Sequence, residues 1–247
     1  MVDRPRIVVT LHGPEQASLE EPTWATFDNY LEAVRRAGGE PVALDPTSGP
    51  KERRAVFAAM DALLLPGGAD LDPSLYGEPP HPRAAAEPAR DDLELQAWNA
   101  AREQRVPIFG VCRGFQAINV FSGGRLVQHL EGHDSPSHAP EAHALHIDPG
   151  SRLARILGEA DPLLSTEVNS YHHQAVRPSD VAPGLRASGV APHHDGELVE
   201  ALEAADPADW LLGVQFHPER PEFIGPEFAR LWRAFVDAAR ERAAHRS

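Results

Sequence analysis

The chain has 247 residues, with 23 lysine and arginine residues against 37 aspartate and glutamate residues, so its formal charge is −14. A composition of 42% hydrophobic and 24% charged residues is that of a folded globular protein and excludes disordered and fibrous chains. The acidity repels phosphate groups, which argues against nucleic acid and an anionic membrane surface as main partners. We therefore expect a small-molecule ligand.

The longest apolar stretches are residues 62–65, 106–112 and 210–216, far below the ~20 residues that a membrane span needs. The N-terminal residues run directly into a short β-branched stretch with no apolar signal region, so we expect a cytoplasmic protein. Cys112 is the only cysteine, which excludes an intramolecular disulfide. Its thiol is either inert or a nucleophile, and the neighbouring residues indicate which of the two applies.

The first half of the chain alternates short apolar stretches with helical patterns. Strands are expected at residues 7–11, 41–44, 62–65 and 106–111. Helices are expected where Trp24, Phe27, Leu31 and Val34 recur at helical spacing, and at residues 51–60, 91–105 and 115–121. Strands that are apolar on both faces and alternate with helices predict a mostly parallel sheet with helices on both sides.

The second half carries strand patterns with little helix between them. These strands are expected at residues 126–130, 143–148, 185–190, 198–202 and 211–216, and some of them should form a small antiparallel extension. Residues 227–242 return to a helical pattern with one apolar face. The whole chain, residues 1–247, is predicted to be a single α/β domain with three α/β/α layers, like flavodoxin.

Cys112 follows an apolar stretch and has a glycine two residues away on either side. The pattern Gly110-x-Cys112-x-Gly114, between a predicted strand and a predicted helix, is typical of a nucleophile elbow. Glycine is needed because the sharp turn leaves no room for side chains. The sulfur then lies at a helix start, where unpaired amides and the helix dipole favour a thiolate. A buried structural cysteine is the alternative, but it does not explain the paired glycines.

A base for the cysteine is expected in residues 213–219, of sequence GVQFHPE. The predicted strand 211–216 delivers His217 at its carboxyl end, beside the end of the strand that carries Cys112. Glu219 can then accept a hydrogen bond from one ring nitrogen of His217, which leaves the other nitrogen to face the sulfur. Taken alone, this segment favours an exposed loop histidine. Together with the elbow it predicts a catalytic triad.

Motifs along most of the chain resemble those of one family. The sequences PGG at residues 66–68, CRGFQ at 112–116 and GVQFHPE at 213–219 together resemble class I glutamine amidotransferase domains. PGGADLDPSLYG at 66–77, RDDLE at 90–94 and NSYHHQ at 169–174 narrow the resemblance to the peptidase C26 branch, the γ-glutamyl-γ-aminobutyrate hydrolase family.

The resemblance implies an oxyanion hole made of backbone amides. In the family these belong to the second glycine of the PGG turn and to the residue after the cysteine, which here are Gly68 and Arg113. Only the main chain is used at both positions. The Arg113 side chain therefore either points elsewhere or forms a salt bridge with Glu94 or another acidic residue.

The resemblance also implies contacts with the amino-acid head of a γ-glutamyl substrate. These contacts would come from Gln116, Ser170, Tyr171 and His172. Chemistry alone leaves alternatives, because Gln116 could be a helix-surface amide and Tyr171 a core residue. Polar loop residues beside a catalytic centre are often functional, which favours binding for residues 170–172.

Five histidines in one region raise the question of a metal. They are His129, His133, His138, His143 and His146. Their spacing matches no compact set of ligands, so solvated histidines are favoured over a zinc site. We predict no metal and no organic cofactor.

The resemblance implies a cysteine-dependent hydrolase that cleaves a γ-glutamyl amide to glutamate and an amine through a γ-glutamyl thioester, in putrescine or polyamine catabolism. One alternative is a glutaminase subunit that passes ammonia to a synthetase partner. Another is a non-enzymatic binding protein on the same fold, because a fold does not fix a function. The expected partner is a small γ-glutamyl substrate, and a homodimer is one alternative for the oligomeric state.

Overall fold

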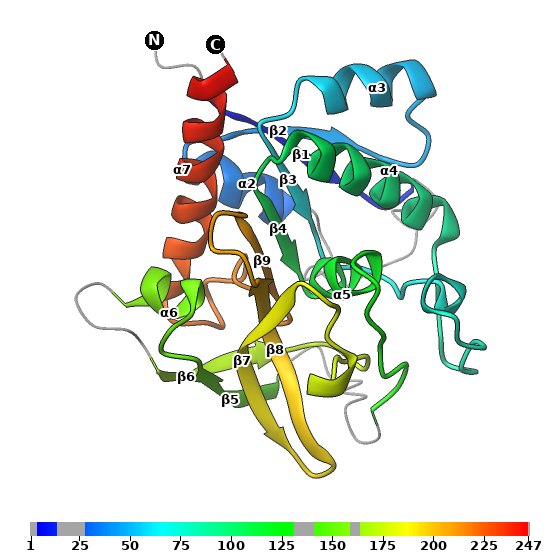
Figure 1. The fold of residues 1–247 in the computed structure, drawn as a ribbon, viewed down its shortest axis with the longest axis vertical. Helices are drawn as coiled ribbons and strands as arrows, with labels where there is room; N and C mark the ends of the chain where they lie inside the picture. The colour runs from blue at the N-terminus through cyan, green and yellow to red at the C-terminus, as the bar shows by residue number, and fades with distance from the viewer. Residues whose placement is uncertain (1–3, 14–27, 131–140, 159–163, 247) are drawn as a thin grey trace.

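The computed structural model describes residues 4–13, 28–130, 141–158 and 164–246 (Figure 1). Within these ranges, nine strands form one sheet in the order β2-β1-β3-β4-β9-β8-β7-β5-β6. The strands are β1 (Arg6–Thr10), β2 (Glu40–Leu44), β3 (Ala62–Leu65), β4 (Ile108–Val111), β5 (Glu141–Ile147), β6 (Ser165–Ser170), β7 (Leu185–His193), β8 (Gly196–Ala204) and β9 (Leu211–Val214). The α-helices are α2 (Asp28–Arg36), α3 (Pro50–Ala58), α4 (Pro88–Gln104), α5 (Arg113–Phe121), α6 (Arg152–Leu157) and α7 (Ala229–Arg246).

The five neighbouring strands β2, β1, β3, β4 and β9 run parallel and make up one part of the sheet. Apart from β2 at the edge of the sheet, which is mostly half-buried or exposed, these strands are buried on both faces. Along β3, for example, Leu64 belongs to one apolar core, whereas Leu63 and Leu65 belong to the other. A strand that is buried on both faces must be apolar throughout, which is why the sequence predicts these strands well.

Helices cover both faces of the sheet. Apolar residues of α2, α6 and α7 pack in the core that contains Leu64, and those of α3, α4 and α5 pack in the core that contains Leu63. Figure 1 shows α7 on one side of the sheet and α3 and α4 on the other. The three-layer α/β/α fold predicted from the sequence is confirmed.

The remaining strands form an antiparallel extension. β8 pairs with β9, β7 with β8, β5 with β7 and β6 with β5, all antiparallel. The β7–β8 hairpin projects as two long arrows in Figure 1. The predicted antiparallel extension is therefore present, and it contains four of the nine strands.

Two parts of the sequence prediction were wrong in the second half. Residues 126–130 do not form a strand, because only Val127 makes an isolated bridge, to Ala175. Leu126 and Leu130 are buried there as loop anchors, and such anchors give the same apolar pattern as a short strand. The prediction also omitted β6 and α6, since β6 is a polar edge strand that pairs only with β5, and α6 has only six residues.

The remaining predicted elements are present with small shifts of their ends. The first predicted helix corresponds to α2, which contains Leu31 and Val34, while Trp24 and Phe27 lie outside the described residues. None of the helices in the described ranges combines the length and the apolar character that crossing a bilayer requires.

Candidate active site

Cys112 lies between β4 and α5 in a backbone conformation that residues other than glycine rarely adopt. Its φ is 53° and its ψ is −108°. Its N–H donates to the Val214 carbonyl at 2.8 Å, which ties the turn to β9. A non-glycine residue in such a conformation costs on the order of 1–3 kcal/mol and is typical of active sites. The predicted elbow is therefore present in the structure.

The glycines on either side of Cys112 are required by close contacts. A Cβ atom at Gly114 would lie 1.9 Å from the Leu65 carbonyl oxygen, and one at Gly110 would lie 2.5 Å from the Gly114 oxygen. Both distances are far below any real contact. The elbow thus brings the start of α5 directly against the end of β3, and only glycine fits there.

His217 and Glu219 lie after β9, which pairs with the strand that leads to Cys112. His217 Nδ1 donates to Glu219 Oε1 at 2.6 Å, and both side chains are buried. The Nε2 atom is also buried and remains available on the other side of the ring. The structure thus brings the three predicted residues together, at the carboxyl ends of two neighbouring parallel strands.

The charges around His217 set its protonation state. Burial lowers the pKa of His217, but the charges of Glu219 and Cys112 raise it more, and the resulting pKa is about 10. His217 is therefore an imidazolium at neutral pH.

The PGG turn follows β3 and lies against the triad. A Cβ atom at Gly67 would lie 3.2 Å from His217 Cε1 and 3.5 Å from Cys112 Cβ. Gly68 comes next, with a φ of 147°. Arg113 is the first residue of α5, where N–H groups have no acceptor within the helix. Gly68 thus follows a residue that lies beside the triad, and Arg113 follows Cys112 directly, while their role as oxyanion donors stays a prediction.

The Arg113 side chain takes the second of the two alternatives that the sequence left open. It is buried and forms salt bridges with Glu94 and Asp91 on α4. Its guanidinium group therefore points into the protein, and only its backbone amide remains at the elbow.

Gln215 contacts the sulfur, although the sequence analysis gave it no role. Its Nε2 donates to Cys112 Sγ at 3.5 Å. Gln116 Nε2 in turn donates to Gln215 Oε1 at 3.1 Å and to the Gln174 carbonyl at 3.3 Å. Gln116 thus lies behind Gln215. The only available signal was that Gln215 is two residues before His217 in the GVQFHPE motif.

The three predicted contacts of residues 170–172 lie differently. The Tyr171 ring stands edge-on to His217, with a centroid distance of 5.1 Å and an angle of 84°. Ser170 is buried at the end of β6. His172 is buried, donates from Nδ1 to the Gln174 carbonyl at 2.9 Å, and has its Nε2 3.6 Å from Glu200. Substrate binding by these residues stays a prediction.

Two further residues hold His217, and the sequence analysis assigned a role to neither. Asn169 accepts from the His217 N–H at 2.8 Å and donates to its carbonyl at 3.0 Å. The Tyr30 hydroxyl accepts from the Gly67 N–H at 3.1 Å and lies 3.4 Å from His217 Nδ1. Asn169 lies in the NSYHHQ motif, which was a signal, whereas Tyr30 is 187 residues from His217 and has none.

Among the described residues, one group of side chains is arranged so that it could share a metal ion. Three side chains that could share an ion are His193, His194 and Asp195, at the β7–β8 turn away from the triad. His129, His143 and His146 do not gather into such a group in the described chain, and His133 and His138 lie outside it.

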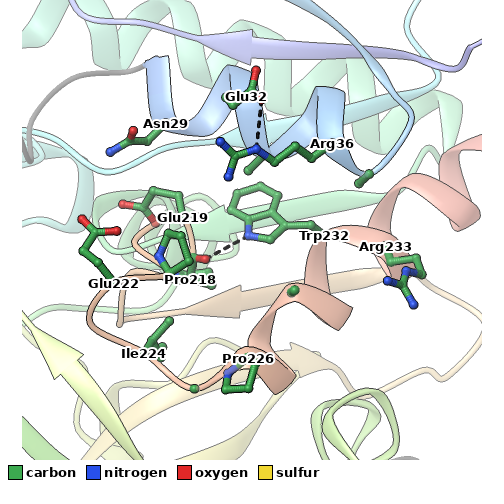
Figure 2. A pocket seen from close by; sticks show the side chains of 15 residues that line it. Asn29, Glu32, Arg36, Pro218, Glu219, Glu222, Ile224, Pro226, Trp232 and Arg233 are labelled. Atoms are coloured by element: carbon green, nitrogen blue, oxygen red, sulfur yellow. Dashed lines mark hydrogen bonds and ion pairs between the residues drawn. The ribbon is translucent and has the colours of Figure 1, made fainter.

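A cavity of about 370 Å³ lies beside Pro218 and Glu219 (Figure 2). Glu219 and Pro218 line it together with residues of α2 and α7, whereas Cys112 and Gly68 do not. Figure 2 shows Trp232 at its back, donating to the Pro218 carbonyl. The cavity therefore adjoins the orienting carboxylate and is separate from the sulfur.

A known family matches the part of the chain that carries these residues. The family model described as Peptidase C26 matches residues 7–219, from β1 to the predicted triad glutamate. The chain belongs to the peptidase C26 family. Membership of this family indicates a hydrolase.

Two named relatives are similar to this chain over most of their lengths. Protein NtpR of Enterococcus hirae is 41% identical over 204 residues, which are 78% of this chain and 81% of that protein. The γ-glutamyl-γ-aminobutyrate hydrolase PuuD of Escherichia coli K12 is 35% identical over 207 residues, 78% of this chain and 77% of that protein.

A solved structure shares the fold of this peptidase C26 protein. The glutaminase domain of Trypanosoma brucei CTPS, solved with bound acivicin, matches with a TM-score of 0.65 and 19% identity. The match covers 96% of this chain and 94% of that one. The fold is thus that of class I glutamine amidotransferase-like domains.

Proposed function

We propose that this protein hydrolyses γ-glutamyl amides to glutamate and an amine through a γ-glutamyl thioester on Cys112. The observation that carries the proposal is the strained Cys112 elbow beside the buried His217–Glu219 pair. The similarity to PuuD supports a γ-glutamyl substrate, and γ-glutamyl-γ-aminobutyrate is the first compound to test.

In the first half-reaction the Cys112 thiolate attacks the γ-carbonyl carbon and forms a C–S bond. The carbonyl electron pair moves to oxygen, where the backbone N–H groups of Gly68 and Arg113 stabilise the negative charge. Collapse of this intermediate breaks the C–N bond. The His217 imidazolium donates its Nε2 proton to the departing nitrogen, and the amine leaves.

In the second half-reaction His217 acts as a base. Once the sulfur is bound in the thioester, its negative charge no longer raises the pKa of His217, so the neutral ring is more accessible. His217 then takes a proton from water as the water oxygen attacks the thioester carbon. The C–S bond breaks, glutamate leaves, and the thiolate and the imidazolium are restored.

The predicted substrate contacts divide into two groups under this proposal. The Tyr171 ring stands edge-on to His217, and Ser170 is its neighbour in the chain, which supports the proposal that these two contact the glutamyl head. Gln116 donates to Gln215, whereas His172 donates to the Gln174 carbonyl and lies beside Glu200. We assign these two the role of positioning the residues that contact substrate.

The test is glutamate release from a panel of γ-glutamyl-γ-aminobutyrate, other γ-glutamyl amides and glutamine. Wild type should release glutamate from at least one γ-glutamyl amide, and Cys112→Ala should lose this activity by about 10⁴-fold or more. Because Cys112 is the only cysteine, intact mass spectrometry of denatured, acid-quenched enzyme reads the thioester without ambiguity.

The same assay separates the alternatives. Hydrolysis of glutamine alone would favour an amidotransferase subunit with a synthetase partner. No turnover and no thioester with any compound would contradict a γ-glutamyl hydrolase and favour a binding protein. Asp209→Asn, at an exposed salt bridge with Arg102, serves as a control that should keep full activity.

A further inference from the structure

A buried network of charges joins α4 to both sides of the elbow. Arg90, Glu94 and Arg113 are each at most 1% exposed. Arg90 Nε donates to Glu94 Oε1 at 2.9 Å, and Arg113 forms salt bridges with the other Glu94 oxygen and with Asp91. Burial raises the pKa of Glu94, but the charges of Arg113 and Arg90 outweigh it and hold that pKa below its ordinary value. Glu94 is therefore held in its charged form.

Arg90 also forms hydrogen bonds with the PGG turn. Its Nη2 donates to the Pro66 carbonyl at 3.0 Å and to the Gly67 carbonyl at 2.8 Å. A Cβ atom at Gly68 would lie 2.0 Å from Arg90 Nη1, so the guanidinium group fits only because residue 68 is glycine. A side chain at residue 68 and the Arg90 guanidinium therefore cannot occupy this space together.

The hydrogen bond from Arg90 to the Gly67 carbonyl fixes the direction of the Gly68 N–H. The Gly67 carbonyl and the Gly68 N–H belong to one planar trans peptide, in which the C=O and the N–H point in opposite directions. When Arg90 holds the carbonyl on one side, the N–H is held on the other. This N–H is the first of the two proposed oxyanion donors.

The second donor is connected to the same carboxylate. Arg113 contributes its backbone N–H to the elbow, while its side chain is anchored on Glu94 and Asp91. Glu94 therefore links Arg90, which orients one amide, to Arg113, which carries the other. The Thr10 hydroxyl donates to Glu94 Oε1 at 2.9 Å and completes the contacts of that oxygen.

We infer that Arg90 is a positioning residue for the oxyanion hole, and that Glu94 couples the two amide donors into one rigid unit. This inference rests on the proposed acyl transfer at Cys112. Stability alone would not need these charges, because apolar residues of similar size often replace a buried ion network without loss. A planar guanidinium can reach two carbonyls and a carboxylate at once, which neither lysine nor methionine can do.

The experiment compares two reactions of the same sulfur. Acylation by a γ-glutamyl amide needs the oxyanion hole, whereas alkylation by iodoacetamide displaces iodide in one step and forms no oxyanion. Arg90→Lys and Arg90→Met should lower kcat by about 10²-fold, comparable to the loss of one oxyanion donor, with little change in KM. The alkylation rate of Cys112 should change by less than about threefold, because neither variant touches the sulfur.

The matched control is Arg53 on α3. It too donates to backbone carbonyls of a preceding loop, those of Ser48 and Pro46, and its salt bridge is with the exposed Asp92, outside the buried network. Arg53→Lys and Arg53→Met should leave both reactions unchanged. If Arg90 only supports the fold, then Arg90→Lys, which keeps the charge and most of the volume, should acylate at nearly the wild-type rate.

The outcomes are distinct. Loss of acylation without loss of alkylation supports the inference. Equal loss of both, or of neither, in a folded Arg90 variant overturns it and leaves the proposed function standing. If both Arg90 variants fail to fold, Glu94→Gln carries the test with the same expected signature, since an amide cannot accept from both arginines as a carboxylate does. A wild type that acylates with no γ-glutamyl amide removes the proposed function itself.

Discussion

The parallel and antiparallel parts of the sheet contribute to the site in different ways. The parallel strands β3, β4 and β9 end in the PGG turn, Cys112 and the segment that carries His217. The antiparallel part brings in Asn169, which holds the His217 backbone, and Glu200, which faces His172. The parallel part therefore supplies the groups proposed to react, and the antiparallel part supplies groups that hold them.

This difference follows from the geometry of the two parts. Parallel strands all end at the same edge, so residues from distant parts of the sequence meet there without special contacts. Antiparallel strands alternate in direction, so this part supports the site through specific contacts, such as the hydrogen bonds of Asn169 and the ring contact of Tyr171 with His217. We therefore expect changes in the parallel part to act through sterics and chemistry, and changes in the antiparallel part to act through orientation.

The largest effect is expected at Gly114, where the parallel part leaves no space. In Gly114→Ala the new methyl group would meet the Leu65 carbonyl, so the free energy of unfolding should fall by about 3 kcal/mol or more, and activity should be lost. Urea unfolding followed by circular dichroism measures this. Gly49→Ala, which has open space around its Cβ, should cost less than about 1 kcal/mol. Similar stability of the two variants would contradict a steric elbow.

The second effect is chemical and depends on pH. Glu219→Gln removes the carboxylate that raises the pKa of His217, so this pKa should fall from about 10 toward neutrality or below, and kcat should fall by about 10²-fold or more. In wild type the raised pKa means that the charged pair stabilises the fold fully below about pH 6.5, and that this contribution is lost as pH rises through 10.

NMR titration of His217 in wild type and in Glu219→Gln measures this shift. An unchanged His217 titration in the variant would show that Glu219 is not the source of the raised pKa.

The third effect tests support from the antiparallel part. Asn169→Leu should leave the buried N–H and carbonyl of His217 unpaired, lowering stability by about 2–3 kcal/mol and kcat by about tenfold. Asn119 is a matched control, because it too binds backbone carbonyls and an N–H, at the end of α5. Asn119→Leu should cost similar stability with little loss of kcat. Equal losses of kcat in both variants would mean that stability alone is being measured.

The smallest effect is expected at Tyr30, which connects the PGG turn to His217. Tyr30→Phe keeps the ring and removes one hydrogen bond to the Gly67 N–H, so stability should fall by about 1 kcal/mol and kcat by a few-fold. Thermal unfolding and steady-state kinetics measure both. A drop in kcat as large as that of Glu219→Gln would instead place the phenol among the reacting groups.

The sequence predicts well where the reason for a residue is local. An apolar strand between two helices, and glycines two residues from a cysteine, are constraints that neighbouring residues impose on each other. For this reason the parallel strands, the elbow and the order of Cys112, His217 and Glu219 follow from the chain. Polar β6 and the buried loop at 126–130 do not, because their character depends on what lies beside them.

What only the tertiary structure decided is which distant side chains meet at the elbow. The order and register of β3, β4 and β9 bring the PGG turn, Cys112 and His217 together. The same packing sets Tyr30 beside His217, Gln215 against the sulfur and the Arg113 side chain on Glu94. No local pattern encodes these contacts, since each depends on the positions of whole strands and helices that are far apart in the sequence.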